Sequence, residues 1–169
     1  MKKFLFIIII LNLSIQIKAQ SHENEITTYY FIRHAEKIRT DTTNKNPNLT
    51  EKGIGRAQNW SSVFKHVTFD SIYATNYNRT IQTATPTAKD KNLVIQFYNP
   101  RTLFIEDFKL KTIGKTILIV GHSNTTPQFV NKILGTNKYA DINNSNNSNL
   151  YIVTISNNRI TDILLEINL

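Results

Sequence analysis

The chain has 169 residues, a formal net charge of +8 at pH 7 and no cysteine. Its length suits one ordinary domain with a hydrophobic core of its own. Disulfide bonds are excluded, so the core and the backbone hydrogen bonds must supply the stability.

The first 19 residues are expected to be a secretory signal peptide. Met1–Lys3 is basic, Phe4–Leu13 is apolar apart from Asn12, and Ile17–Ala19 ends in a small residue suited to cleavage. The apolar run is shorter than the roughly 20 residues of a membrane-spanning helix. We therefore expect export to the periplasm or the extracellular space, without stable membrane insertion after cleavage. An uncleaved N-terminal anchor is the alternative.

Cleavage would leave 150 residues with a formal charge of +5, because three lysines depart with the signal peptide. Such a moderately basic surface suits small anions or an anionic envelope, and we expect no nucleic-acid partner. Simple solubility is an alternative explanation of the charge. Residues 20–26 are expected to be a short polar leader, and residues 27–169 a single domain.

The domain is predicted to begin with a strand and a helix. Thr27–Arg33 is rich in Thr, Tyr, Phe and Ile, which favour strands. Residues 37–48 are polar and predict a loop. A helix is expected from Thr50, a good N-cap residue. Its buried face is predicted from four apolar residues at helical spacing, Ile54, Ala57, Trp60 and Phe64.

Three further strand–helix units are predicted. The strands are expected at Ser71–Ala74, Leu93–Phe97 and Thr116–Val120. The helices are expected over residues 78–85, 103–113 and 127–134. Pro86 is expected to end or kink the first of these helices, because proline lacks an amide donor and its ring clashes with the preceding turn. Gly114 and Gly135 are expected to close the other two.

The C-terminal part differs in pattern. Residues 137–149 are rich in Asn and Ser and predict a loop. Leu150–Ile155 and Ile160–Leu169 predict a hairpin, and the alternation from Ile163 to Leu169 predicts that its second strand buries one face. The expected fold class is α/β: a three-layer sandwich with a mostly parallel sheet flanked by helices and a C-terminal β-hairpin.

Basic side chains follow three of the predicted strands. Arg33 and His34 end the first strand, and His122 follows the fourth. Arg79 lies in the first turn of the helix after the second strand, where a helix N-terminus favours anions. Because ligands of open α/β sheets bind at the carboxyl ends of the strands, these residues predict one pocket for an anion such as phosphate.

The two histidines allow several interpretations. His34 is either a structural residue or a nucleophile, with one ring nitrogen attacking phosphorus and the other held by a backbone carbonyl. A zinc site formed by His34, His122 and Glu36 is a further alternative. Arg33 and Arg79 oppose it, because they would lie beside the cation. We therefore expect no metal.

Four segments resemble one known family. They are Arg33–Lys37, Leu49–Gly53, Arg79–Ala84 and Val120–Pro127. In this order they are similar to motifs of the histidine phosphatase superfamily, in its phosphoglycerate mutase-like branch, and the chain resembles a compact form of that branch. The similarity extends from about Thr28 to Leu134.

The resemblance implies a phosphatase that needs no cofactor and hydrolyses phosphate monoesters or phosphoramidates. His34 would carry the phosphoryl group, and Arg33, Arg79 and His122 would complete the catalytic pocket. The substrate would be a phosphorylated small molecule or an envelope component. A phosphate- or anion-binding module of the same fold, without turnover, is the alternative.

The general acid is the part of the pattern that the sequence matches least. Many members of this branch place a glutamate after the third strand, in a long insertion. The corresponding stretch here is short, and its acids, Glu106 and Asp107, fall in a predicted helix. We therefore take Glu36, two residues beyond His34, as the candidate general acid.

Overall fold

This computed structural model describes residues 25–102, 104–157 and 159–168. The expected signal peptide and most of the expected leader lie outside these ranges, as do Leu103 and Leu169. No helix in the described part of the chain is long and apolar enough to cross a membrane.

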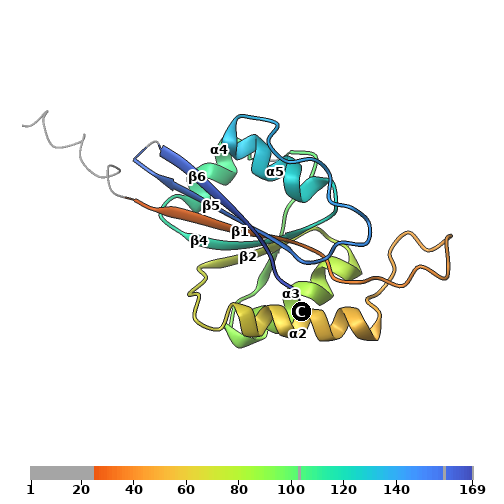
Figure 1. Cartoon of the computed structure of the whole chain (residues 1–169). Coiled ribbons are helices and arrows are strands. Elements are labelled where there is room, and N and C mark those ends of the chain that lie inside the picture. Colours follow the sequence, from red (N-terminus) through yellow and green to blue (C-terminus); the bar gives the residue numbers. More distant parts are fainter. Residues whose placement is uncertain (1–24, 103, 158, 169) are drawn as a thin grey trace, which may run out of the picture.

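Among the described residues, six strands form one mixed sheet in the order β3-β2-β4-β1-β5-β6 (Figure 1). Their bounds are β1 Thr27–Arg33, β2 Ser71–Ala74, β3 Ile95–Phe97, β4 Thr116–Gly121, β5 Asn149–Ser156 and β6 Arg159–Glu166. The first four strands are parallel, and β5 and β6 form the antiparallel hairpin at one side. The expected fold class is confirmed.

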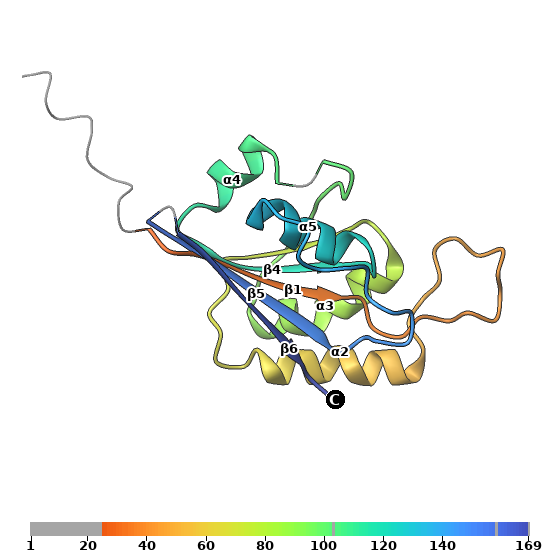
Figure 2. The ribbon, with the colours of Figure 1, turned by 45° about the horizontal axis from the view of Figure 1, so that its top comes forward.

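In the part of the chain that the structure describes, four helices cover the two faces of the sheet. They are α2 Glu51–Val63, α3 Asn78–Asp90, α4 Glu106–Thr112 and α5 Thr125–Leu134. Both ribbon views place α2 and α3 on one face and α4 and α5 on the other (Figures 1 and 2). The chain therefore has three layers, and the loops that connect them lie at the ends of the strands.

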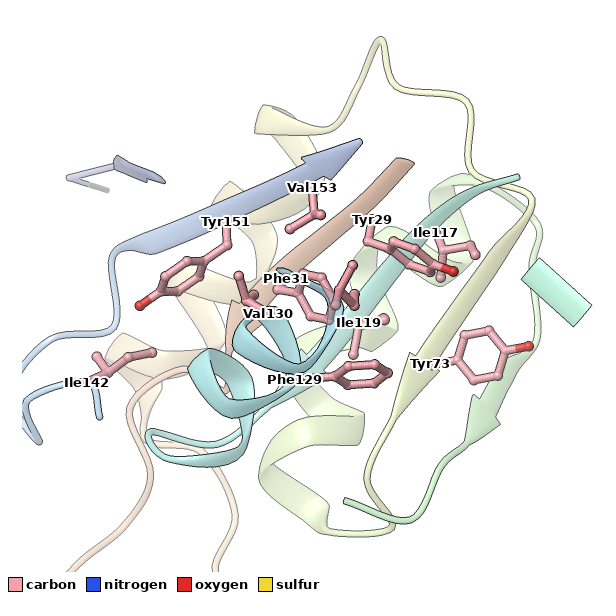
Figure 3. Packing of buried hydrophobic residues seen from close by; sticks show 11 residues of the cluster. Tyr29, Phe31, Tyr73, Ile117, Ile119, Phe129, Val130, Ile142, Tyr151 and Val153 are labelled. Atoms are coloured by element: carbon pink, nitrogen blue, oxygen red, sulfur yellow. The ribbon is translucent and has the colours of Figure 1, made fainter. Parts of the chain in front are cut away.

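Each central strand supplies side chains to both layers of the core. Tyr29 and Phe31 of β1 belong to the cluster on the α5 side, whereas Ile32 belongs to the cluster on the α2 and α3 side. Figure 3 shows Phe31 beside Phe129 of α5, and the two ring centroids are 5.2 Å apart. On the opposite face, Trp60 of α2 is fully buried.

Two helix boundaries follow the expected chemistry. The Thr50 side chain accepts a hydrogen bond from the Gly53 amide and caps α2. Gly135 ends α5 in the left-handed conformation, which glycine adopts without steric cost.

The predicted face of α2 needs one correction, because Ile54 is 50% exposed. The buried residues of this helix include Gly53, Ala57 and Trp60, and Phe64 follows in the C-cap position. At about 100° per residue, Ile54 lies roughly 90° from the centre of that arc.

Pro86 was expected to end or kink a helix near residue 85, and it does not end the helix, because α3 runs on to Asp90. The residues that follow Pro86 include Thr87 and Ala88, and both are buried. Their packing offsets the cost of a proline inside a helix, which is roughly 3 kcal/mol for the lost hydrogen bond and the ring clash together.

The last correction concerns β6, which was expected to bury one face. Ile163 is 55% and Leu165 is 41% exposed. The strand lies at the edge of the sheet, where it pairs with β5 alone. The alternation of residue types along β6 therefore reflects the geometry of a strand, and it does not indicate that one face of the strand is buried.

Candidate functional site

Pairing of β1 with β4 brings the two histidine segments together. The parallel register sets Arg33 opposite Gly121, and the His34 amide donates to the Gly121 carbonyl at 2.9 Å. His34 and His122 therefore leave the sheet at the same edge, and their ring centroids are 5.5 Å apart. The sequence separates these residues widely, and the sheet makes them neighbours.

His34 is buried, and its protonation state follows from its partners. Its Nδ1 atom lies 2.7 Å from the Ala35 carbonyl oxygen, which can only accept, so Nδ1 carries the proton. The Nε2 atom then keeps its lone pair. Burial lowers the pKa of His34 to about 3, opposed by the Ala35 bond and assisted by nearby Arg33, His122 and Arg79. The ring is neutral near pH 7.

His122 is fixed by a chain of hydroxyl groups. Its Nε2 atom lies 2.8 Å from the Thr75 Oγ atom, and the Thr75 hydroxyl donates to the Thr80 Oγ atom at 3.1 Å. Because Thr75 uses its only proton there, Nε2 of His122 is the donor in the first bond. Burial lowers the pKa of His122 to about 4, and the charges of Arg79, Lys37 and Arg33 act in the same direction.

Arg33 has a buried side chain that organises the Asn-rich loop. Its Nη1 group donates to the carbonyl oxygens of Asn143 at 2.9 Å, Asn144 at 3.3 Å and Asn146 at 2.7 Å. The same loop reaches His34, because Asn147 Nδ2 donates to its carbonyl oxygen at 2.8 Å. Arg33 therefore both lines the site and fixes the loop beside it.

Arg79 differs from Arg33, because its guanidinium is not committed to the protein. It lies in the first turn of α3, with its Cζ atom 4.4 Å from the centre of the Tyr77 ring. Within the described residues, its buried Nε and Nη1 atoms have no hydrogen-bond partner. Buried charged donors without partners are costly, so this geometry suits an incoming anion.

Glu36 is the one predicted site residue whose side chain does not lie with the side chains of Arg33, His34, Arg79 and His122. Its carboxylate forms a two-pronged ion pair with Arg56 of α2, at distances of 2.9 and 3.0 Å. The hydrogen bond and charge of Arg56 hold the pKa of Glu36 below its usual value although burial opposes the shift. A carboxylate stabilised in this way is a poor proton donor, and Glu36 does not line the pocket.

The zinc alternative depended on Glu36 joining the two histidines. Across residues 25–102, 104–157 and 159–168, no group of three His, Asp or Glu side chains is arranged to hold a metal ion. Glu36 is engaged by Arg56 instead, as described above.

The converging residues line a pocket of about 710 Å³. Its lining consists of Arg33, His34, Lys37, Arg39, Tyr77, Arg79, Pro100, Arg101, His122, Ser123, Asn124, Thr125, Gln128 and Asn144. Five of these residues are Lys or Arg, and none of the described lining residues is Asp or Glu. The pocket is therefore built for negatively charged ligands.

Sequence reasoning missed several lining residues. Lys37 and Arg39 were assigned to a polar loop, although both follow the Arg33–His34 pair closely. Tyr77 precedes Arg79 by two residues, and its ring also meets the His122 ring edge-on, with centroids 5.3 Å apart. The surplus of basic residues around the first motif was the signal that could have found them.

Residues 29–100 match the model of the histidine phosphatase superfamily (branch 1). The match covers less than half of the chain, and over this segment the chain is similar to members of the superfamily. The matched segment contains Arg33, His34 and Arg79. His122 lies beyond it and reaches the site through the pairing of β1 with β4.

Solved structures are similar to this chain at the level of the fold. A mycobacterial glucosyl-3-phosphoglycerate phosphatase superposes with a TM-score of 0.67 at 10% identity, covering 85% of this chain and 99% of that one. The alpha-ribazole phosphatase of Shigella flexneri gives 0.65 at 17% identity, covering 84% and 98%. The protein histidine phosphatase SixA, solved with tungstate, gives 0.65 at 13% identity, covering 82% and 96%. Among curated proteins, none matches the sequence.

Proposed function

We propose that this chain is a histidine phosphatase that hydrolyses phosphate monoesters or phosphoramidates without a metal, through a phosphohistidine on His34. One observation carries the proposal. The Nδ1–H group of His34 is tied to the Ala35 carbonyl, so Nε2 keeps its lone pair inside a pocket of cations. A neutral imidazole held in one tautomer beside free anion-binding groups is an activated nucleophile.

In the first step, Nε2 of His34 attacks phosphorus, and the bond to the leaving group breaks on the opposite side. Positive charge develops on the ring as the bond forms, and the Ala35 carbonyl stabilises it through Nδ1–H. Arg79 and Arg33 would face the phosphoryl oxygens, where preorganised donors lower the barrier most. Water then attacks phosphorus and releases phosphate, which regenerates neutral His34.

His122 has a complementary role in this proposal. Its pKa is lowered to about 4, so it is neutral near pH 7. A bound phosphate brings negative charge, which raises the pKa of a nearby imidazole. With Nε2 committed to Thr75, the other ring nitrogen would take up the proton and donate to a phosphoryl oxygen. Substrate binding would thus be coupled to proton uptake.

The test is turnover of p-nitrophenyl phosphate at pH 5 to 7, with chelator and without added metal. His34→Ala should abolish turnover. His66→Ala is the matched control, because His66 is exposed and does not line the pocket. Wild-type activity no higher than that of His34→Ala would overturn the proposal.

A catalytically inactive anion-binding module is the second candidate, and one observation favours it. No carboxylate lines the described part of the pocket, so an acidic proton donor of the usual kind is missing. Such a module would bind inorganic phosphate without turnover of any phosphate ester. Calorimetric binding of phosphate by wild type, together with no turnover, would select this candidate.

A further inference from the structure

Hydrolysis of an ordinary alkyl phosphate requires a proton for the leaving oxygen. Among the described residues, the pocket holds no Asp or Glu that could supply it. Glu36 is held by Arg56 and points to α2. The proton donor, if it belongs to the pocket, must be another kind of group.

Few lining residues can give up a proton near neutral pH. The guanidinium groups of the four arginines do not, because they stay protonated in proteins. His122 has its Nε2–H group committed to Thr75, and in the proposed mechanism its other ring nitrogen donates to a phosphoryl oxygen, so neither N–H group is left for the leaving oxygen. Tyr77 has its ring against Arg79 and His122. Lys37 is the remaining titratable cation in the lining.

The backbone around Lys37 is held firmly. Residue 37 forms a β-bridge with Leu49, and the neighbouring residues are fixed by two bonds of 2.9 Å, from the Ile38 amide to the Asn48 carbonyl and from the Thr50 amide to the Glu36 carbonyl. Successive side chains of an extended segment point to opposite sides. With Glu36 turned toward α2, Lys37 turns toward the pocket.

The Lys37 ammonium group is half-buried and uncommitted. It has no hydrogen-bond or ion-pair partner within the described ranges of the chain. Burial lowers the pKa of Lys37, and the charges of Arg79, Arg39 and Arg33 lower it further. A lysine surrounded by cations gives up its proton more readily than a free one.

We propose that the Lys37 ammonium group protonates the leaving oxygen in place of a carboxylic acid. The inference rests on the proposed phosphohistidine mechanism. As Nε2 of His34 bonds to phosphorus, the bond from phosphorus to the leaving oxygen breaks, and that oxygen takes a proton from Lys37 and departs as an alcohol. The neutral Lys37 amine then removes a proton from the attacking water. Phosphate leaves, His34 is neutral again and Lys37 is an ammonium group again.

The experiment compares two substrates in wild type and in Lys37→Met and Lys37→Arg. Glycerol phosphate has a poor leaving group that needs the proton, whereas p-nitrophenol leaves as its anion. Both variants should lose about 10²- to 10⁴-fold in kcat with glycerol phosphate and little with p-nitrophenyl phosphate. Lys37→Arg keeps the charge but cannot donate, so it separates proton transfer from charge. In wild type, kcat for glycerol phosphate should fall at high pH, and this limb should vanish in both variants.

Arg39→Met is the matched control, because Arg39 is a second cation of the same lining that cannot donate a proton. Its loss should be the same factor with both substrates. Activity of Lys37→Arg equal to wild type on glycerol phosphate would overturn the inference, as would equal losses with both substrates. A selective loss in Tyr77→Phe with unchanged Lys37 variants would also overturn it. Turnover of p-nitrophenyl phosphate that depends on His34 would leave the proposed function standing in each case.

Discussion

Gly53 lies where α2 approaches the segment that carries the catalytic candidates. A Cβ atom at this position would lie 2.2 Å from the Glu36 carbonyl oxygen and 3.1 Å from the Glu36 carbonyl carbon, whereas Gly55 has open space within 4 Å. Ordinary carbon contacts need about 3.5 Å, so Gly53→Ala must push α2 and residue 36 apart by about 1 Å. The same substitution at Gly55 displaces nothing.

The two alanine variants are therefore expected to change stability in opposite directions. Overpacking costs about 1–3 kcal/mol, which outweighs the gain of up to about 1 kcal/mol in helix propensity. Gly53→Ala should lower the free energy of unfolding by up to about 2 kcal/mol, and Gly55→Ala should raise it by up to about 1 kcal/mol. Each kcal/mol moves the Tm by about 2–4 °C.

Activity offers a second measurement on the same pair. Residue 36 lies between His34 and Lys37, and a misplacement of about 1 Å can cost about 10²-fold in rate. We expect kcat for p-nitrophenyl phosphate to fall in Gly53→Ala and to stay unchanged in Gly55→Ala. Thermal unfolding followed by circular dichroism gives the stabilities. Equal Tm and kcat values for the two variants would refute the close approach of α2 to residue 36.

Three further outcomes are expected. Arg79→Ala should lose about 10²- to 10³-fold in kcat/KM. Its Tm should change little, because two buried nitrogens of the Arg79 side chain have no protein partner among the described residues. Unchanged kinetics would contradict the role of Arg79 in binding the phosphoryl group. Dialysis against EDTA should leave kcat unchanged, and strong inhibition that added zinc reverses would revive the metal alternative. The Tm should fall as the pH is lowered from about 6.5 toward 4. In this range the unfolded chain binds protons on His34 and His122, whose ordinary pKa is near 6.5, whereas the folded protein does not, because its pKa values there are about 3 and about 4. A His34→Gln/His122→Gln variant whose Tm has the same pH slope as wild type would count against these shifts.

The sequence was a good guide wherever local chemistry decides the structure. Hydrophobic runs marked the central strands, Thr50 marked the start of α2 and Gly135 the end of α5. The convergence of Arg33, His34, Arg79 and His122 followed from one rule, since the carboxyl ends of parallel strands share an edge of the sheet.

Contacts between residues that are distant in the sequence determined the features of the site that the sequence did not predict. Glu36 precedes Arg56 by twenty residues, and only the packing of α2 against the first strand's exit makes them partners. Arg33 was expected to bind phosphate. Its hydrogen bonds to the Asn-rich loop were not predicted, because the sequence does not show that this loop lies beside the end of β1. The same packing fixes the direction of Lys37: local alternation places it opposite Glu36, and the pairing of Glu36 with Arg56 decides that this side is the pocket.

Side-chain burial was the second feature for which the prediction from the sequence differed from the structure. Ile54 fits the helical spacing of apolar residues in α2, but it lies outside the buried face of that helix. Which face of α2 is buried depends on the elements that pack against it. Ile163 alternates correctly and stays exposed, because β6 is an edge strand. Pro86 remains inside α3, since packing of the following turn outweighs the lost hydrogen bond.

The most direct test of the account is to trap the phosphorylated protein. Wild type would be mixed with p-nitrophenyl phosphate, quenched in alkaline denaturant, where phosphohistidine survives, and analysed by peptide mass spectrometry, with His34→Ala and His66→Ala treated in parallel. The account predicts a phosphoryl group on the peptide that contains His34, present in His66→Ala and absent in His34→Ala. Turnover without a phosphorylated protein, or a phosphoryl group on His122 instead, would contradict it.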